Sequence, residues 1–136
     1  MPTSTVLYKG ELRTECTHEL SQNLILTDAP RDNHGKGEAF SPTDLVATAL
    51  GACMLSIMGI AANTRGWDIS GAKAFVDKIM SKEPPRRIVE IGVRLEMPTR
   101  TLNDSDKKIL EATALACPVA KSLHADLTQN ISFVWI

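Results

Sequence analysis

The chain has 136 residues, a length that can bury a sizeable core, so we expect a single domain over residues 1–136. A formal net charge of −1 excludes the basic footprint of a nucleic-acid-binding protein and a polybasic membrane patch. Three cysteines are too few and too far apart for a disulfide scaffold or a paired-ligand zinc site. The first residues lack the pattern of a signal peptide, and we therefore expect a cytoplasmic protein with reduced thiols.

The first forty residues have strand character. Short runs rich in Thr, Val and Leu predict strands at residues 4–10, 12–18 and 23–28. They are followed by "APRDNHGKGEAF", residues 29–40, whose Pro, Gly and Asn content predicts a loop.

A long helix follows this loop. In "SPTD", Ser41 suits the N-cap, Pro42 the first helical position and Asp44 the third position of a capping box. We expect the helix to run from about Pro42 to Thr64 and to stop near Gly66.

The helix is uncharged along most of its length. Residues 45–62 are long enough to be considered as a membrane span, but several small and polar residues weaken their transfer into lipid. We expect instead a helix buried on all sides, inside a core or an interface, and no membrane association.

The second half alternates strands and helices. Residues 72–80 and 88–97 are predicted to pair as a hairpin across "SKEPPRR", because apolar and polar residues alternate along 88–97. Helices are expected at 102–116 and 118–127, and a final strand at 130–136. This order predicts the α+β class.

Cys117 directly precedes Pro118 and would then be the N-cap of a short helix. The free N–H groups and the positive end of the helix dipole would point at its sulfur and lower its pKa. A cap residue without redox chemistry is the alternative on residue type alone.

Cys53 lies in the middle of the long helix, within "LGACMLSIMG". Burial raises a thiol pKa, so a nucleophilic role requires a cation from another element or another subunit. From spacing alone, a small apolar core residue is the favoured interpretation of Cys53.

The two cysteine segments occur together. "FSPTDLVATALGAC" followed by "ALACPVAKSLHADLTQNISFVW" resembles the family of osmotically induced protein C and organic hydroperoxide resistance protein (OsmC/Ohr). The resemblance covers nearly the whole chain. It implies an intertwined homodimer in which two sheets pack around long central helices.

The resemblance also implies a thiol-dependent peroxidase. The cysteine matching Cys53 attacks an organic hydroperoxide, and the cysteine matching Cys117 resolves the sulfenic acid to a disulfide. An external dithiol, of lipoyl type, then reduces the disulfide, and no metal, haem or flavin takes part. An apolar pocket suits an alkyl or lipid hydroperoxide.

One position departs from the family pattern. The most active peroxidases of the family carry Glu directly after the proline of the helix-opening motif, where this chain has Thr43; Asp44 follows one residue later. Asp44 is the candidate for the acid and Arg13 for the activating arginine, with Arg31 as the second choice. Asp44 is also explained as a helix cap.

Other roles stay open. The chain could bind a lipid-like ligand in a dimer pocket without catalysis, or perform other thiol chemistry, such as disulfide reduction. Cys16, two residues from His18, is a weak metal-site pattern to which we assign no role.

Overall fold

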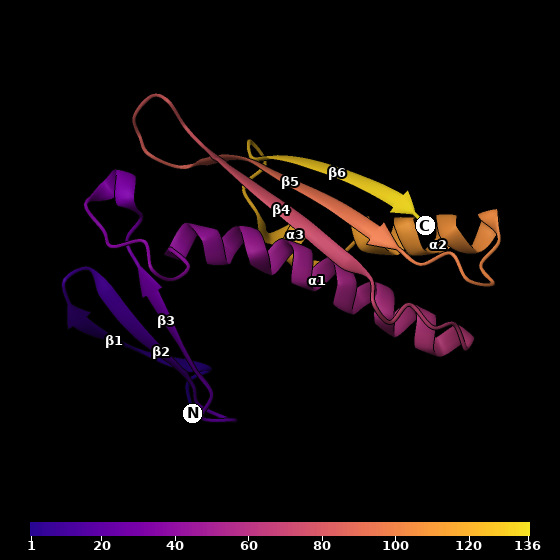
Figure 1. Cartoon of the computed structure of the whole chain (residues 1–136), viewed down its shortest axis with the longest axis horizontal. Helices are drawn as coiled ribbons and strands as arrows, with labels where there is room; N and C mark the ends of the chain where they lie inside the picture. Colours follow the sequence, from indigo (N-terminus) through magenta and orange to yellow (C-terminus); the bar gives the residue numbers. More distant parts are fainter. The chain divides into compact units, whose positions relative to one another are not determined.

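The computed structural model describes residues 1–136 and contains two compact units, residues 1–46 and 47–136 (Figure 1). Each unit is described by itself and has its own three-stranded sheet. Helix α1 (Pro42–Arg65) begins in the first unit and continues into the second. The α+β class is confirmed, and the expectation of a single domain stays a prediction.

The first unit is an antiparallel sheet of β1 (Ser4–Gly10), β2 (Arg13–His18) and β3 (Leu24–Asp28) in that order. All three strands were expected within one residue of these bounds. Strands β2 and β3 pair in a register that sets Arg13 opposite Asp28 at one end of the sheet.

The loop after β3 folds back onto this end of the sheet and contains the short 3-10 helix η1 (Arg31–Asn33). The Ala29 N–H donates to the Leu12 carbonyl at 3.0 Å, and the Asp28 N–H donates to the Phe40 carbonyl at 3.0 Å. Gly35 is required here, because a Cβ at this position would lie 1.6 Å from the Ala29 carbonyl oxygen.

Helix α1 has the predicted start and end. The Ser41 hydroxyl accepts from the Asp44 N–H at 3.0 Å, and the Asp44 carboxylate accepts from the Ser41 N–H at 3.0 Å, which is a capping box. Gly66 adopts a left-handed φ of 72° just past the last helical residue, and the Trp67 N–H bonds back to the Ala62 carbonyl at 2.9 Å.

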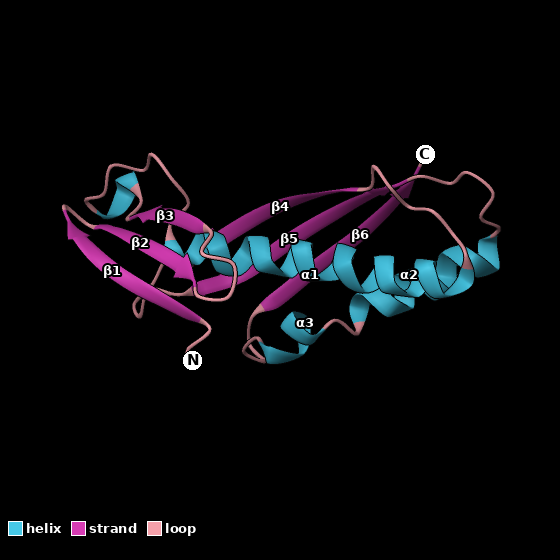
Figure 2. Ribbon diagram, turned by 90° about the horizontal axis from the view of Figure 1, so that it is seen from below, coloured by secondary structure: helices cyan, strands magenta, loops and turns pink.

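The second unit has a mixed sheet of β4 (Lys73–Met80), β5 (Ile88–Met97) and β6 (Thr128–Trp135). The expected β4–β5 hairpin is confirmed, and its pairing is antiparallel. Strand β6 pairs with β5 in parallel, so the chain crosses between them through α2 (Asp104–Leu115) and α3 (Pro118–Ser122). Figure 2 shows the helices of this unit on one face of the sheet.

The crossover helices begin where their caps predict. Asn103 and Asp106 form a reciprocal capping box at the start of α2. Helix α3, expected to reach residue 127, ends at Ser122. Leu123 is extended and the His124 ring nitrogen accepts from the Asp126 N–H at 3.0 Å, so a turn replaces the second half of the expected helix.

One face of α1 lies in the core of the second unit. Leu50, Met54 and Met58 are fully buried, together with Ile91 and Leu95 of the inward face of β5. Helix α1 also packs closely against β4, since a Cβ at Gly51 would lie 2.8 Å from a methyl group of Val76.

The opposite face of α1 is not covered within the single chain. It presents small or apolar residues to solvent, including Ala49, Ala52, Ser56 and Ile60. The expectation of burial on all sides is therefore met on one side only. By length and composition α1 could also cross a membrane, a criterion that the core helix of a soluble protein meets as well.

Candidate active site

Cys53 lies on α1 with its side chain half-buried against the core of the second unit. The only charged residues of α1 are Asp44 in its first turn and Arg65 in its last turn. No charged group of its own helix is therefore within reach of the Cys53 sulfur.

Cys117 is the N-cap of α3, as predicted, and is fully buried. Its Sγ accepts a hydrogen bond from the Ala120 N–H at 3.3 Å, and Pro118 occupies the first helical position. The rigid φ of proline and the missing N–H at that position favour a helix that starts directly after the sulfur.

The prediction that this cap lowers the pKa of Cys117 is wrong. Burial raises the pKa of the Cys117 thiol, and the N–H groups of Ala120 and Val119 oppose this effect only in part. Cys53 raises the pKa further, through a side-chain hydrogen-bond interaction and through its charge. Desolvation decides the direction because the sulfur lies beneath the surface, which the sequence alone does not reveal.

The structure thus brings Cys53 and Cys117 together, from the middle of α1 and from the start of α3. Both thiols are free. They differ in access, because Cys53 is partly exposed whereas Cys117 is not. A reagent from solvent reaches Cys53 first, and the buried Cys117 is its neighbour.

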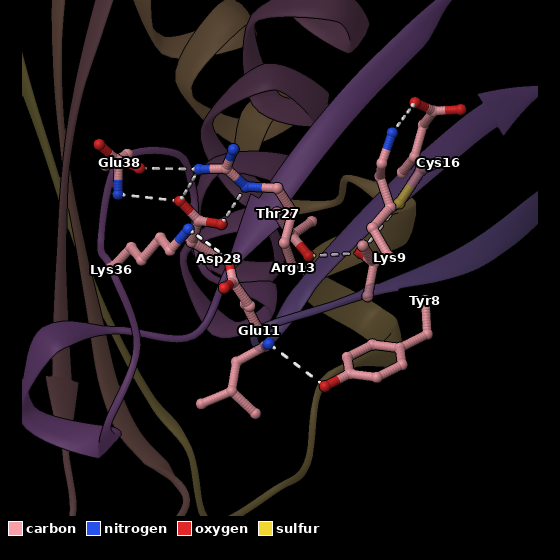
Figure 3. Close-up of polar contacts among 12 residues, drawn as sticks. Tyr8, Lys9, Glu11, Arg13, Cys16, Thr27, Asp28, Lys36 and Glu38 are labelled. Atoms are coloured by element: carbon pink, nitrogen blue, oxygen red, sulfur yellow. Dashed lines mark hydrogen bonds and ion pairs between the residues drawn. The ribbon is translucent and has the colours of Figure 1, made fainter.

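Arg13 belongs to a cluster of opposite charges in the first unit (Figure 3). Its Nε donates to Asp28 Oδ1 at 2.6 Å and its Nη2 donates to Asp28 Oδ2 at 2.8 Å, which is a bidentate pair. Nη2 also donates to Glu38 Oε1 at 3.0 Å, while the Glu38 N–H donates to Asp28 Oδ2 at 3.0 Å.

This cluster sets the ionisation of its members. The hydrogen bonds from Arg13 hold the pKa of the Asp28 carboxyl below its ordinary value, against the effect of burial. In turn, Asp28 raises the pKa of the Arg13 guanidinium. Arg13 is therefore a fixed cation whose orientation is set by a carboxylate only 1% exposed.

Sequence reasoning missed Asp28 and Glu38. The signal for Asp28 was present, since a positive residue begins one predicted strand and a negative residue ends the next. Glu38 could not be found in this way, because it reaches Arg13 only through the fold of the loop.

Asp44 lies at the predicted helix start, where its carboxylate accepts from the Ser41 N–H. The Thr43 hydroxyl forms a hydrogen bond with the Ser41 hydroxyl at 3.2 Å. These contacts are those of a helix cap, and a catalytic part for Asp44 stays a prediction.

Arg31 and Cys16, also considered in the sequence, belong to the first unit. Arg31 is exposed and its Nε donates to the Lys36 carbonyl at 3.5 Å. Cys16 is half-buried in β2, with its Sγ 3.7 Å from the Thr14 hydroxyl. The structure contains no group of three His, Cys, Asp or Glu side chains placed to hold a metal ion.

Known structures share the fold of this chain. A protein from Psychrobacter arcticus 273-4, provisionally described as an osmotic stress induced and detoxification response protein, is 50% identical, with a TM-score of 0.92 and coverage of 98% of this chain and 96% of that chain. An OsmC-like protein from Mycoplasma pneumoniae has a TM-score of 0.80 at 18% identity, covering 98% and 95% of the two chains.

A third structure is an organic hydroperoxide resistance protein OsmC from Legionella pneumophila, with a TM-score of 0.71 at 20% identity and coverage of 98% of both chains. No protein of curated function matches the sequence significantly. Residues 35–132, which include both cysteines of the pair, match the sequence model of the OsmC-like proteins. The chain therefore belongs to the OsmC-like protein family.

Proposed function

We propose that the chain is a thiol-dependent peroxidase that reduces organic hydroperoxides, with Cys53 as the peroxidatic and Cys117 as the resolving cysteine. The observation that carries this proposal is the pairing of a partly exposed thiol with a buried thiol of raised pKa. Family membership and the organic hydroperoxide resistance protein among the similar structures support it.

The reaction begins at Cys53. Its thiolate attacks the distal oxygen of the hydroperoxide, the O–O bond breaks, and the alcohol leaves after taking up a proton. Cys53 becomes a sulfenic acid, and the peroxide is thereby reduced by two electrons.

Cys117 completes the oxidation. Its sulfur attacks the Cys53 sulfenic sulfur, a disulfide forms and water leaves. An external dithiol of lipoyl type then reduces this disulfide by thiol–disulfide exchange and becomes a disulfide itself. Burial shields Cys117 from solvent and raises its pKa, which disfavours the reactive thiolate, so in this proposal Cys53 is the first of the two thiols to meet the peroxide.

Arg13 is the proposed source of the positive charge that activates Cys53. A guanidinium beside a thiolate favours the charged form of the sulfur. Asp28 and Glu38 orient this guanidinium. In this proposal they take the place of the family's glutamate, which pairs with the arginine and which is replaced by Thr43 in this chain.

The active form in this proposal is a cytoplasmic homodimer. A second copy would cover the small and apolar residues that α1 leaves exposed, of which Ile60 is 63% exposed. Contiguous apolar surface on a soluble chain is typical of a protein interface.

Thiol counting tests the reaction. Reduced protein receives one equivalent of cumene hydroperoxide, and free thiols are counted in the wild type and in the Cys53→Ser, Cys117→Ser and Cys16→Ser variants. We expect the wild type and Cys16→Ser to lose two thiols rapidly, Cys53→Ser to lose none, and Cys117→Ser to accumulate a sulfenic acid. Equal behaviour of all four proteins would exclude the peroxidase and favour ligand binding or other thiol chemistry.

A further inference from the structure

Gly92 lies in the interior of β5, the central strand of the second sheet. Its φ is not in the left-handed region, so the backbone does not require glycine. A Cβ at this position would lie 3.7 Å from the Asp77 Cβ and 3.9 Å from the Asn130 carbonyl oxygen, both ordinary contacts. Alanine would fit and would strengthen the strand, so packing does not explain the glycine.

The missing side chain opens a hollow of about 160 Å³ over Gly92 and Val93, lined by Asp77, Arg94, Asn130 and Ser132. The strand pairing aligns Asp77, Gly92 and Asn130 in one row across the sheet. This Gly92 hollow is on the solvent face, because Asp77, Arg94 and Asn130 are exposed. A glycine inside a strand is typical of a place where a ligand approaches the backbone closely.

The polar groups around the hollow are available for a ligand. The side chains of Asp77, Asn130 and Ser132 form no hydrogen bond within the chain. Arg94 is held in place, since its guanidinium stacks 4.3 Å from the centre of the Phe75 ring and its Nη1 donates to Glu96 at 2.5 Å. Its remaining N–H groups are free to donate.

We propose that the Gly92 hollow binds a small zwitterion of the size of a free amino acid. Arg94 donates to the carboxylate of the ligand, and Asp77 accepts from its ammonium group. The Asn130 amide and the Ser132 hydroxyl supply further hydrogen bonds. The small volume excludes larger ligands, because pockets for drug-sized molecules measure about 300 Å³ or more.

The charges of the hollow distinguish a zwitterion from a simple ion. Asp77 and Glu96 together outweigh Arg94 by one negative charge, which disfavours a lone anion beside the guanidinium. A lone cation would gain nothing from the Arg94 guanidinium, whose remaining donors would stay bound to water. A ligand that carries both charges meets both sides of the hollow without adding net charge.

A titration of the ¹⁵N-labelled full chain with L-alanine, followed by NMR, tests this proposal. We expect saturable shifts of the amide signals of Gly92 and Asn130, with binding of acetate or methylammonium alone weaker by at least about tenfold. No saturable shift with L-alanine, or an equal response to acetate, would overturn the proposal.

Two variants locate the site. Gly92→Ala should weaken L-alanine binding by at least about tenfold while raising the melting temperature, because the methyl group covers the floor of the hollow and the substitution reduces the entropy of the unfolded chain. Asp77→Asn should weaken L-alanine binding without changing the response to acetate. Unchanged L-alanine binding in a folded Gly92→Ala protein would contradict the assignment.

Discussion

Asp28 combines near-complete burial with full ionisation, which is possible because Arg13 and the Glu38 N–H satisfy both carboxylate oxygens. Transfer of an unpaired carboxylate out of water is strongly unfavourable. Removal of either charge therefore leaves its partner without a counter-charge inside the first unit, which costs more free energy of folding than the loss of a surface ion pair.

Acid should remove this stabilisation. Because the pKa of Asp28 is lowered in the folded chain, its contribution is fully present above the ordinary aspartate range near pH 4 and is lost as the pH falls through the lower, folded value. We expect Asp28→Asn to be less stable than the wild type at pH 7, with a difference that shrinks towards about pH 2. Urea unfolding across this range measures it.

Glu38→Gln is the matched control for this prediction. It removes a carboxylate from the same arginine, but the Glu38 side chain is 62% exposed and its ion pair is screened by water. At pH 7 its effect on the urea midpoint should be smaller than that of Asp28→Asn. A constant difference between Asp28→Asn and the wild type at all pH values would show that ionisation of Asp28 is not the cause.

The two thiols of the candidate pair should differ in alkylation. Two variants in a Cys16→Ser background each keep one thiol of the pair: Cys53→Ser keeps Cys117, and Cys117→Ser keeps Cys53. We expect Cys117 to react with iodoacetamide more slowly than Cys53, by about tenfold or more. Burial both shields Cys117 and raises its pKa. In concentrated urea the two rates should converge, and a faster reaction of Cys117 in the folded protein would contradict the assigned order of oxidation.

At the scale of elements, α1 contains two glycines in different surroundings. A Cβ at Gly51 would lie 2.8 Å from Val76 and 3.3 Å from Ala74, whereas a Cβ at Gly59 would have no neighbour within 4 Å. Helix α1 and strand β4 can approach closely only because residue 51 has no side chain.

Alanine substitutions separate these two roles. Gly51→Ala should destabilise the protein by about 1–3 kcal/mol, because the added methyl overpacks the contact with β4. Gly59→Ala should stabilise it by about 1 kcal/mol, the gain in helix propensity where nothing is displaced. Urea unfolding of both variants is the measurement. A loss of stability in Gly59→Ala would reveal a neighbour that covers this position in solution.

The elements with local signals were predictable from the sequence. Capping residues mark the starts of α1 and α2, and the alternation along residues 88–97 marks β5 and its buried face. The parallel pairing of β6 with β5 was not predicted, because alternation indicates a strand but not its partner or direction. The end of α3 depends on a side-chain contact of His124 that propensity does not reveal.

The site was predictable in part for the same reason. Cys53, Cys117 and Arg13 are distinguished by residue type and by resemblance, and the cap position of Cys117 follows from Pro118. Burial of Cys117 and the part of Glu38 depend on segments far away in sequence. The helix N-terminus lowers the pKa of the Cys117 thiol, whereas burial in the apolar core raises it. Burial has the larger effect, and only the folded chain reveals it.

At the scale of the whole molecule, the uncovered face of α1 predicts self-association. Ile60→Lys should raise the dimer dissociation constant by at least about tenfold, because a charge replaces an apolar side chain in the proposed interface. Sedimentation velocity over a range of concentrations measures this constant. Leu115→Lys is the control, since Leu115 is also an exposed apolar residue, 49% exposed, but lies on α2. Equal effects of both variants, or none, would place the interface elsewhere.

The crossover between β5 and β6 has a consequence for the newly made chain. Cys117 lies between these strands in sequence. The Gln129 side chain of β6 donates to the Ala120 carbonyl of α3 at 2.9 Å, so β6 helps to hold the helix that Cys117 caps. Synthesis proceeds from the N-terminus, so Cys53 leaves the ribosome well before β6 is available to close the sheet. Non-local pairings of this kind also form slowly.

During that interval Cys53 is a thiol without its neighbour. In the proposed reaction, a nascent chain oxidised at Cys53 at this stage has no Cys117 in place to capture the sulfenic acid, and further oxidation to the irreversible sulfinic acid competes. In the proposed peroxidase, docking of the last strand is therefore the folding step that completes the cysteine pair.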